Sequence, residues 1–83
     1  MRLVLKEEGS SKGTFMSYIP GDRPYASLME GIAARMKVTT SRIKNAYIVI
    51  EPVTGMTTKV QLNANENWKL LQNNDVVTVV FQD

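Results

Sequence analysis

The end of the chain constrains the fold more than any other segment. Residues 65–83 predict a short helical turn around Trp68, a polar turn, and then an apolar strand at residues 76–81. The chain also opens on an apolar strand, residues 2–6. We therefore expect one small sheet in which the first and last strands pair.

The segments between these two strands predict three further strands and one helix. The strands are expected at residues 13–19, 46–51 and 57–62, and the helix at residues 24–36. Pro24 suits the first position of a helix, where a missing N–H removes no hydrogen bond. One apolar stripe follows it, made of Leu28, Met29, Ile32, Ala33 and Met36. The predicted order is ββαββ, a short helix and a final strand, an α+β fold in one domain of residues 1–83.

The composition argues against an enzyme. The 83 residues include no Cys and no His, which excludes disulfides, zinc sites built from Cys and His, the commonest general base and the thiol nucleophile. The acidic residues are scattered along the chain. We therefore expect no catalytic residues, no metal site and no cofactor.

Charge and hydropathy narrow the classes of partner. A net charge of +2 is too small to indicate nucleic acid, and no run approaches the roughly 20 apolar residues that span a bilayer. Residues 1–5 are followed at once by Lys6, Glu7 and Glu8, unlike a signal peptide. We expect a soluble, cytoplasmic domain that binds a protein, either a different protein or a second copy of itself. We expect no binding to nucleic acid, membrane or small-molecule substrate.

Alternation along each strand separates a core side from an open side of the sheet. The predicted core is Leu3, Leu5, Leu28, Ile32, Ile48, Ile50, Val60, Leu62, Trp68, Leu71, Val77, Val79 and Phe81. The second strand fits two registers, with either Phe15 and Ile19 or Met16 and Tyr18 pointing inward.

The open side is the first candidate binding surface. It is predicted to carry Arg2, Val4, Tyr47, Val49, Val76, Thr78 and Val80, and the candidate partner-binding residues are Val4, Tyr47, Val49, Thr78 and Val80. Exposed apolar patches of this kind mark interaction sites. The alternative is that Val is frequent because strands favour it and that long neighbouring side chains cover it.

Basic residues form a second candidate. They are Arg2 and Lys6 on the first strand, and Arg35, Lys37, Arg42 and Lys44 around the end of the helix. The alternative interpretation is that cations at a helix C-terminus favour the helix dipole and that surface cations serve solubility.

The chain resembles the ubiquitin-like β-grasp superfamily over nearly its whole length. The most specific piece is Leu71 followed by the polar turn and alternating apolar residues at 73–79, and residues 1–6 alternate as ubiquitin's opening strand does. The resemblance implies that the last strand lies parallel to the first in the centre of the sheet, with the helix across one face. It also implies a binding scaffold whose sheet surface contacts partners. In Ras-binding relatives, basic side chains on early strands meet acidic partners.

The resemblance leaves two functions open. The first is a protein–protein interaction module of a larger scaffold, adaptor or cytoskeletal protein, of which this chain would be the N-terminal domain. The second is a ubiquitin-fold modifier. Conjugated relatives end in an exposed glycine, whereas this sequence ends at Phe81, Gln82 and Asp83, so the modifier interpretation requires a tail that is missing here.

Overall fold

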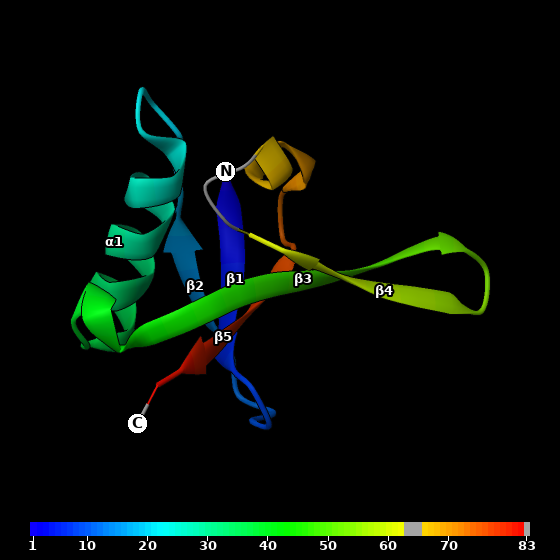
Figure 1. Cartoon of the computed structure of the whole chain (residues 1–83), viewed down its shortest axis with the longest axis horizontal. Coiled ribbons are helices and arrows are strands. Elements are labelled where there is room, and N and C mark those ends of the chain that lie inside the picture. The colour runs from blue at the N-terminus through cyan, green and yellow to red at the C-terminus, as the bar shows by residue number, and fades with distance from the viewer. Residues whose placement is uncertain (63–65, 83) are drawn as a thin grey trace.

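The described part of the chain forms a mixed five-stranded sheet and one α-helix (Figure 1). The computed structural model describes residues 1–62 and 66–82. The elements are β1 (Arg2–Glu7), β2 (Thr14–Ser17), α1 (Pro24–Met36), the 3₁₀ turn η1 (Thr40–Arg42), β3 (Ile43–Val53), β4 (Met56–Gln61), the 3₁₀ turn η2 (Glu66–Leu70) and β5 (Val76–Phe81). The α+β class and the predicted order of elements are confirmed. Residues 63–65, which precede the helical turn, and Asp83 lie outside the described residues.

The first and last strands meet in the middle of the sheet. The strand order is β2-β1-β5-β3-β4, in which β1 and β5 run parallel and the other pairs run antiparallel. Val4 pairs with Val76 and Lys6 with Thr78. The predicted pairing of the two terminal strands, and its parallel direction, are therefore confirmed.

Two strands differ in length from their predictions. β3 has 11 residues rather than the six predicted, because its beginning pairs with β5 and its end continues with β4. Its register shifts between Ile50 and Val53, around Pro52. A bulge is one of the few places in a sheet that tolerates a proline, which has no N–H to donate. β2, by contrast, is limited to 4 residues.

The helix has the predicted bounds and buries four of the five residues of the predicted stripe, while Met36 is partly buried. Leu28, Met29, Ile32 and Ala33 are buried against the sheet. Gly31 in the same helix faces β2, and a Cβ placed on it would fall 2.6 Å from Cε of Met16. Glycine therefore allows α1 to lie close to β2.

The core contains every residue predicted for it, at two levels of burial. Ile50, Val60, Trp68 and Phe81 are only partly buried, and the others are buried. Ile50 and Val60 lie on the part of β3 and β4 that extends past the other strands (Figure 1), where fewer neighbours cover them.

The structure decides the register of the second strand. Met16 and Tyr18 point into the core, and Phe15 and Ile19 are exposed. Tyr18 can be buried because its hydroxyl donates a hydrogen bond of 2.9 Å to the carbonyl oxygen of Pro24, which satisfies the polar atom.

Burial makes Tyr18 a source of sensitivity to high pH. Burial raises the pKa of the Tyr18 phenol above its ordinary value of 10.0. At pH values above 10.0 but below the raised pKa of Tyr18, the folded domain keeps a proton that the unfolded chain releases. The free energy of unfolding therefore falls as pH rises above about 10, by at most about 1.4 kcal/mol per pH unit. Urea titrations from pH 9 to about 11.5 should show a smaller decline for Tyr18→Phe than for the wild type. Equal slopes would contradict this role for Tyr18.

Within the described part of the chain, no helix combines the length and the apolar character needed to cross a membrane.

Candidate interaction site

The open face is the side of the sheet opposite α1. Neighbouring strands place Val4 beside Val76, and Thr78 between Lys6 and Tyr47. Of the five predicted partner-binding residues, Val49 is exposed over 54% of its surface. Val4 and Val80 are half-buried. All five lie on the predicted face, but they are not equally accessible.

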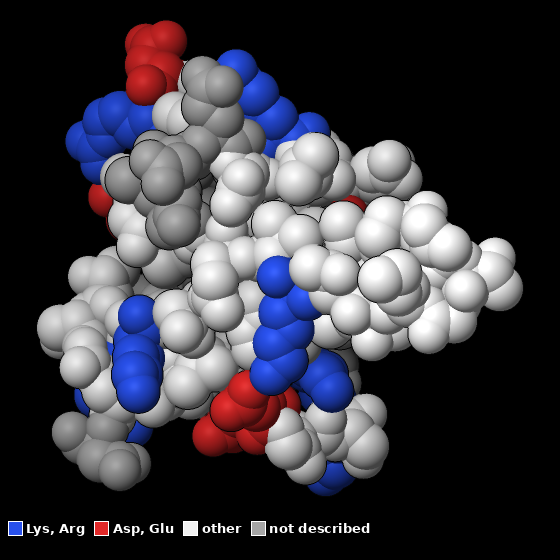
Figure 2. Space-filling model, turned by 45° about the vertical axis from the view of Figure 1, so that its right-hand side comes forward, with Lys and Arg blue, Asp and Glu red and all other residues white. Residues whose placement is uncertain are grey.

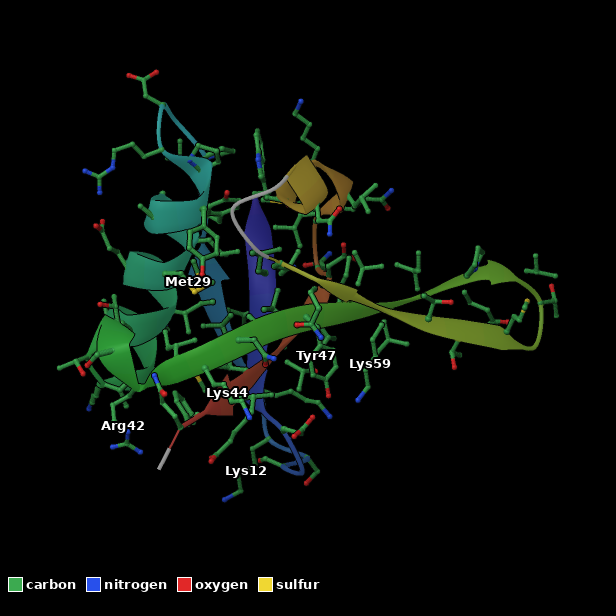
Figure 3. The ribbon with its side chains drawn as sticks, in the orientation of Figure 1. Lys12, Met29, Arg42, Lys44, Tyr47 and Lys59 are labelled. Atoms are coloured by element: carbon green, nitrogen blue, oxygen red, sulfur yellow. The ribbon has the colours of Figure 1, made fainter. Side chains whose placement is uncertain are left out.

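Tyr47 and Thr78 correct the prediction. Their exposed fractions are 7% and 5%, so the expectation that the open face exposes these two side chains is wrong. Their role in binding a partner stays a prediction. The ammonium of Lys59 lies 4.7 Å from the centre of the Tyr47 ring, and the Tyr47 hydroxyl donates a 2.8 Å hydrogen bond to Oε2 of Glu8. Figure 3 shows Tyr47 and Lys59 next to one another. At Tyr47, long polar neighbours therefore cover the strand, as the alternative interpretation predicts.

Tyr47 and Thr78 form the floor of a shallow hollow of about 460 Å³ on the open face. Its lining consists of Lys6, Tyr47, Ile48, Val49, Asn74, Asp75, Val76 and Thr78. Val49 and Val76 are its exposed apolar side chains, while Lys6 and Asp75 supply charge at its border. The arrangement can accept an apolar side chain and interact with charged groups on either side of it.

The six predicted basic residues lie on different parts of the surface. Lys6 lines the open-face hollow, and Arg2 and Arg35 line another hollow of about 680 Å³ between β2 and α1. Lys37 ends the helix with a φ of 59°, and Nε of Arg42 donates to the carbonyl oxygen of Gln82 at 3.2 Å. Lys44 lies at the exposed beginning of β3. In Figure 2 the positive side chains are spread over several parts of the visible surface and do not form one patch.

Arg2 and Arg35 are the two members that the fold brings together. The guanidinium of Arg2 lies 4.7 Å from the centre of the Phe15 ring, and its Nε donates to Oδ1 of Asn74 at 2.9 Å. Nε of Arg35 donates to the carbonyl oxygen of Phe15 at 2.7 Å. Both side chains therefore hold parts of the fold together, which accounts for their positions without a ligand.

Sequence reasoning missed three residues of the open face. Glu8 was not expected there because the first strand was predicted to end at Lys6. Lys59 approaches Tyr47 diagonally from β4, which only the register of the hairpin reveals. Asn45 lies opposite Val80, and its Oδ1 is buried without a hydrogen-bond partner within the described residues.

No group of three or more His, Cys, Asp or Glu side chains that could hold a metal ion occurs among the described residues. Comparison of the chain with protein-family models, with curated proteins and with solved structures gives no match.

Proposed function

We propose that this chain is a ubiquitin-like β-grasp domain that works as a non-catalytic protein-interaction module. The strand order β2-β1-β5-β3-β4 supports the fold assignment, together with the central parallel pair and the single helix. Such a domain contributes binding rather than chemistry to a larger scaffold, adaptor or cytoskeletal protein.

The hollow on the open face is the observation that carries the proposal. It combines two exposed valines with a floor formed by Tyr47 and Thr78. Buried aromatic groups surrounded by apolar contacts and a polar rim are typical of the energetically important part of a protein interface. The partner we infer is a protein segment that inserts an apolar side chain between Val49 and Val76 and carries a carboxylate near Lys6 or Lys59.

Substitutions at the two exposed valines test this surface. Peptides selected by display on the immobilised domain should bind Val49→Asp and Val76→Asp at least about ten-fold more weakly than the wild type, because each substitution places a carboxylate in the apolar contact (a loss of about 1.4 kcal/mol). Isothermal titration calorimetry measures the affinities, and circular dichroism checks the fold of each variant.

Val53→Asp is the matched control. Val53 is as exposed as Val49 but lies at the far end of the β3–β4 hairpin, outside the lining of the hollow. It should keep the wild-type affinity. Selected peptides that bind all three folded variants equally well would contradict the proposed surface.

A further inference from the structure

The end of the β3–β4 hairpin extends past the rest of the sheet (Figure 1). The pairing of β3 with β5 runs from Ile43 to Tyr47, and beyond it β3 pairs with β4 alone. We call residues 48–58 the β3–β4 arm. Val53 and Met56 in this arm are each exposed over 60% of their surface. An isolated two-stranded hairpin is only marginally stable in water, so an additional strand would stabilise the arm.

The outer edge of β4 offers unpaired backbone groups. The amide of Leu62 donates to the carbonyl of Ala46 at 2.8 Å, so by alternation Val60 and Thr58 also direct their amides and carbonyls toward β3. Thr57 and Lys59 direct theirs outward. Within residues 1–62 and 66–82, neither residue has a hydrogen-bond partner on that outer side.

The opposite edge of the sheet is protected. The outward carbonyl of Phe15 accepts a hydrogen bond from Nε of Arg35, and the carbonyl of Ile19 accepts one of 2.9 Å from Oγ of Ser27. Helix side chains thus occupy one outward acceptor within β2 and one just past its end, and covering an edge with a helix is a common way of preventing further strand pairing. Among the described residues, the β4 edge is covered only at its end, where Nδ2 of Asn67 in η2 donates to the carbonyl of Gln61 at 2.8 Å.

We propose that β4 pairs antiparallel with β4 of a second copy of this chain, joining the two sheets across a two-fold axis at Thr58. In this register the amide of Lys59 donates to the carbonyl of Thr57 of the second copy, and the amide of Thr57 donates to the carbonyl of the second copy's Lys59. The symmetry repeats both bonds. Four hydrogen bonds therefore connect the two edges.

The sequence of β4 is complementary to itself in this register. Thr58 lies opposite Thr58 of the second copy, and the exposed Met56 lies opposite Val60, so a Thr–Thr pair and apolar pairs form directly across the junction. Lys59 faces the uncharged Thr57. The ammonium of Lys59 stays 4.7 Å from the centre of the Tyr47 ring in its own chain, so this register brings no like charges into contact. The complementarity of the hydroxyl and apolar pairs favours a second copy as the occupant.

Neighbouring registers are less favourable. An axis at Lys59 places two lysines directly opposite each other, which is destabilising. It also requires the outer side of Gln61, whose carbonyl already accepts a 2.8 Å hydrogen bond from Nδ2 of Asn67. An axis at Thr57 moves the pairing into the turn at Gly55 and removes the contact between Met56 and Val60.

Sedimentation velocity from micromolar concentration to about 1 mM tests the proposal. We expect a concentration-dependent dimer. Lys59→Pro should raise the dissociation constant at least about ten-fold, because proline lacks the outward N–H while the bonds between β4 and β3 involve Thr58 and Val60. Lys59→Thr is the matched control, since it removes the same charge and keeps the N–H, and it should still dimerise. A wild type that is monomeric at about 1 mM, or a folded proline variant that dimerises like the control, would overturn the proposal.

Amide hydrogen exchange of the wild type gives an answer that does not depend on the folding of the proline variant. The amides of Thr57 and Lys59 should exchange more slowly at high protein concentration, while those of Thr58 and Val60 are protected at every concentration. Unchanged exchange at Thr57 and Lys59 would overturn the pairing. Protection of these amides by an added extended peptide, in a domain that stays monomeric, would assign the edge to peptide capture and overturn self-association.

Discussion

Val79→Asp is expected to leave the domain unfolded at 25 °C, whereas Val49→Asp leaves it folded. Val79 lies on β5 with 0% of its surface exposed, so the substitution puts a carboxylate into the core. An unpaired buried charge costs several kcal/mol, which is comparable to the whole stability of a domain of this size, about 4–12 kcal/mol. Circular dichroism and dispersion of the amide NMR signals distinguish the two states.

The comparison with Val49→Asp makes the result specific to the sheet register. The same substitution at Val49, on the open face, places the carboxylate in water and should change the free energy of unfolding by less than about 1 kcal/mol. If Val79→Asp stayed folded with wild-type stability, the assignment of the core and open sides of β5 would be incorrect.

The second large effect is expected at the contact between helix and sheet. Ile32 lies at the middle of α1 and is completely buried in the core. Ile32→Ala removes apolar contacts and leaves a cavity, which should lower the free energy of unfolding by about 2–5 kcal/mol. Urea denaturation measures the loss. The value should lie in the upper part of this range if the surrounding side chains cannot move into the space.

Tyr25→Ala on the same helix is the control for Ile32→Ala. Tyr25 is exposed near the beginning of α1, and its removal should cost less than about 1 kcal/mol. Because Ala is a better helix former than either Ile or Tyr, helix propensity cannot cause a loss of stability in these variants. Equal losses for the two would contradict the assignment of Ile32 to the packed contact between α1 and the sheet.

Local patterns predicted the elements best. The stripe that includes Leu28 and Ile32 gave the bounds of α1, and the alternation around Val77 and Val79 gave β5. Both signals depend only on residues close in sequence, because one face of each element is apolar and the other is not. β2 lacks such a contrast, since Phe15, Met16, Tyr18 and Ile19 are all apolar or aromatic. The pairing of β2 with β1 and the hydrogen bond from the Tyr18 hydroxyl to the carbonyl of Pro24 determine its register.

The candidate site was predicted only in part, because local patterns do not show contacts between residues far apart in sequence. Alternation placed Val4, Val49 and Val80 on the open face. The burial of Tyr47 could not be predicted in this way, because it depends on Lys59 from the neighbouring strand and on Glu8, far away in sequence. Side chains that extend over a strand from its neighbours depend on sheet order and register, and these are properties of the whole fold.

Mapping where a selected peptide binds tests the central claim most directly. In an NMR titration of the wild-type domain, the largest changes in amide chemical shift should occur at Tyr47, Val49, Val76 and Thr78, around the open-face hollow. Amides along β2 and at Arg35 should change little. The largest changes at Phe15 and Arg35 instead, with Tyr47 and Val49 unaffected, would place binding in the hollow between β2 and α1 and contradict the proposed use of the open face.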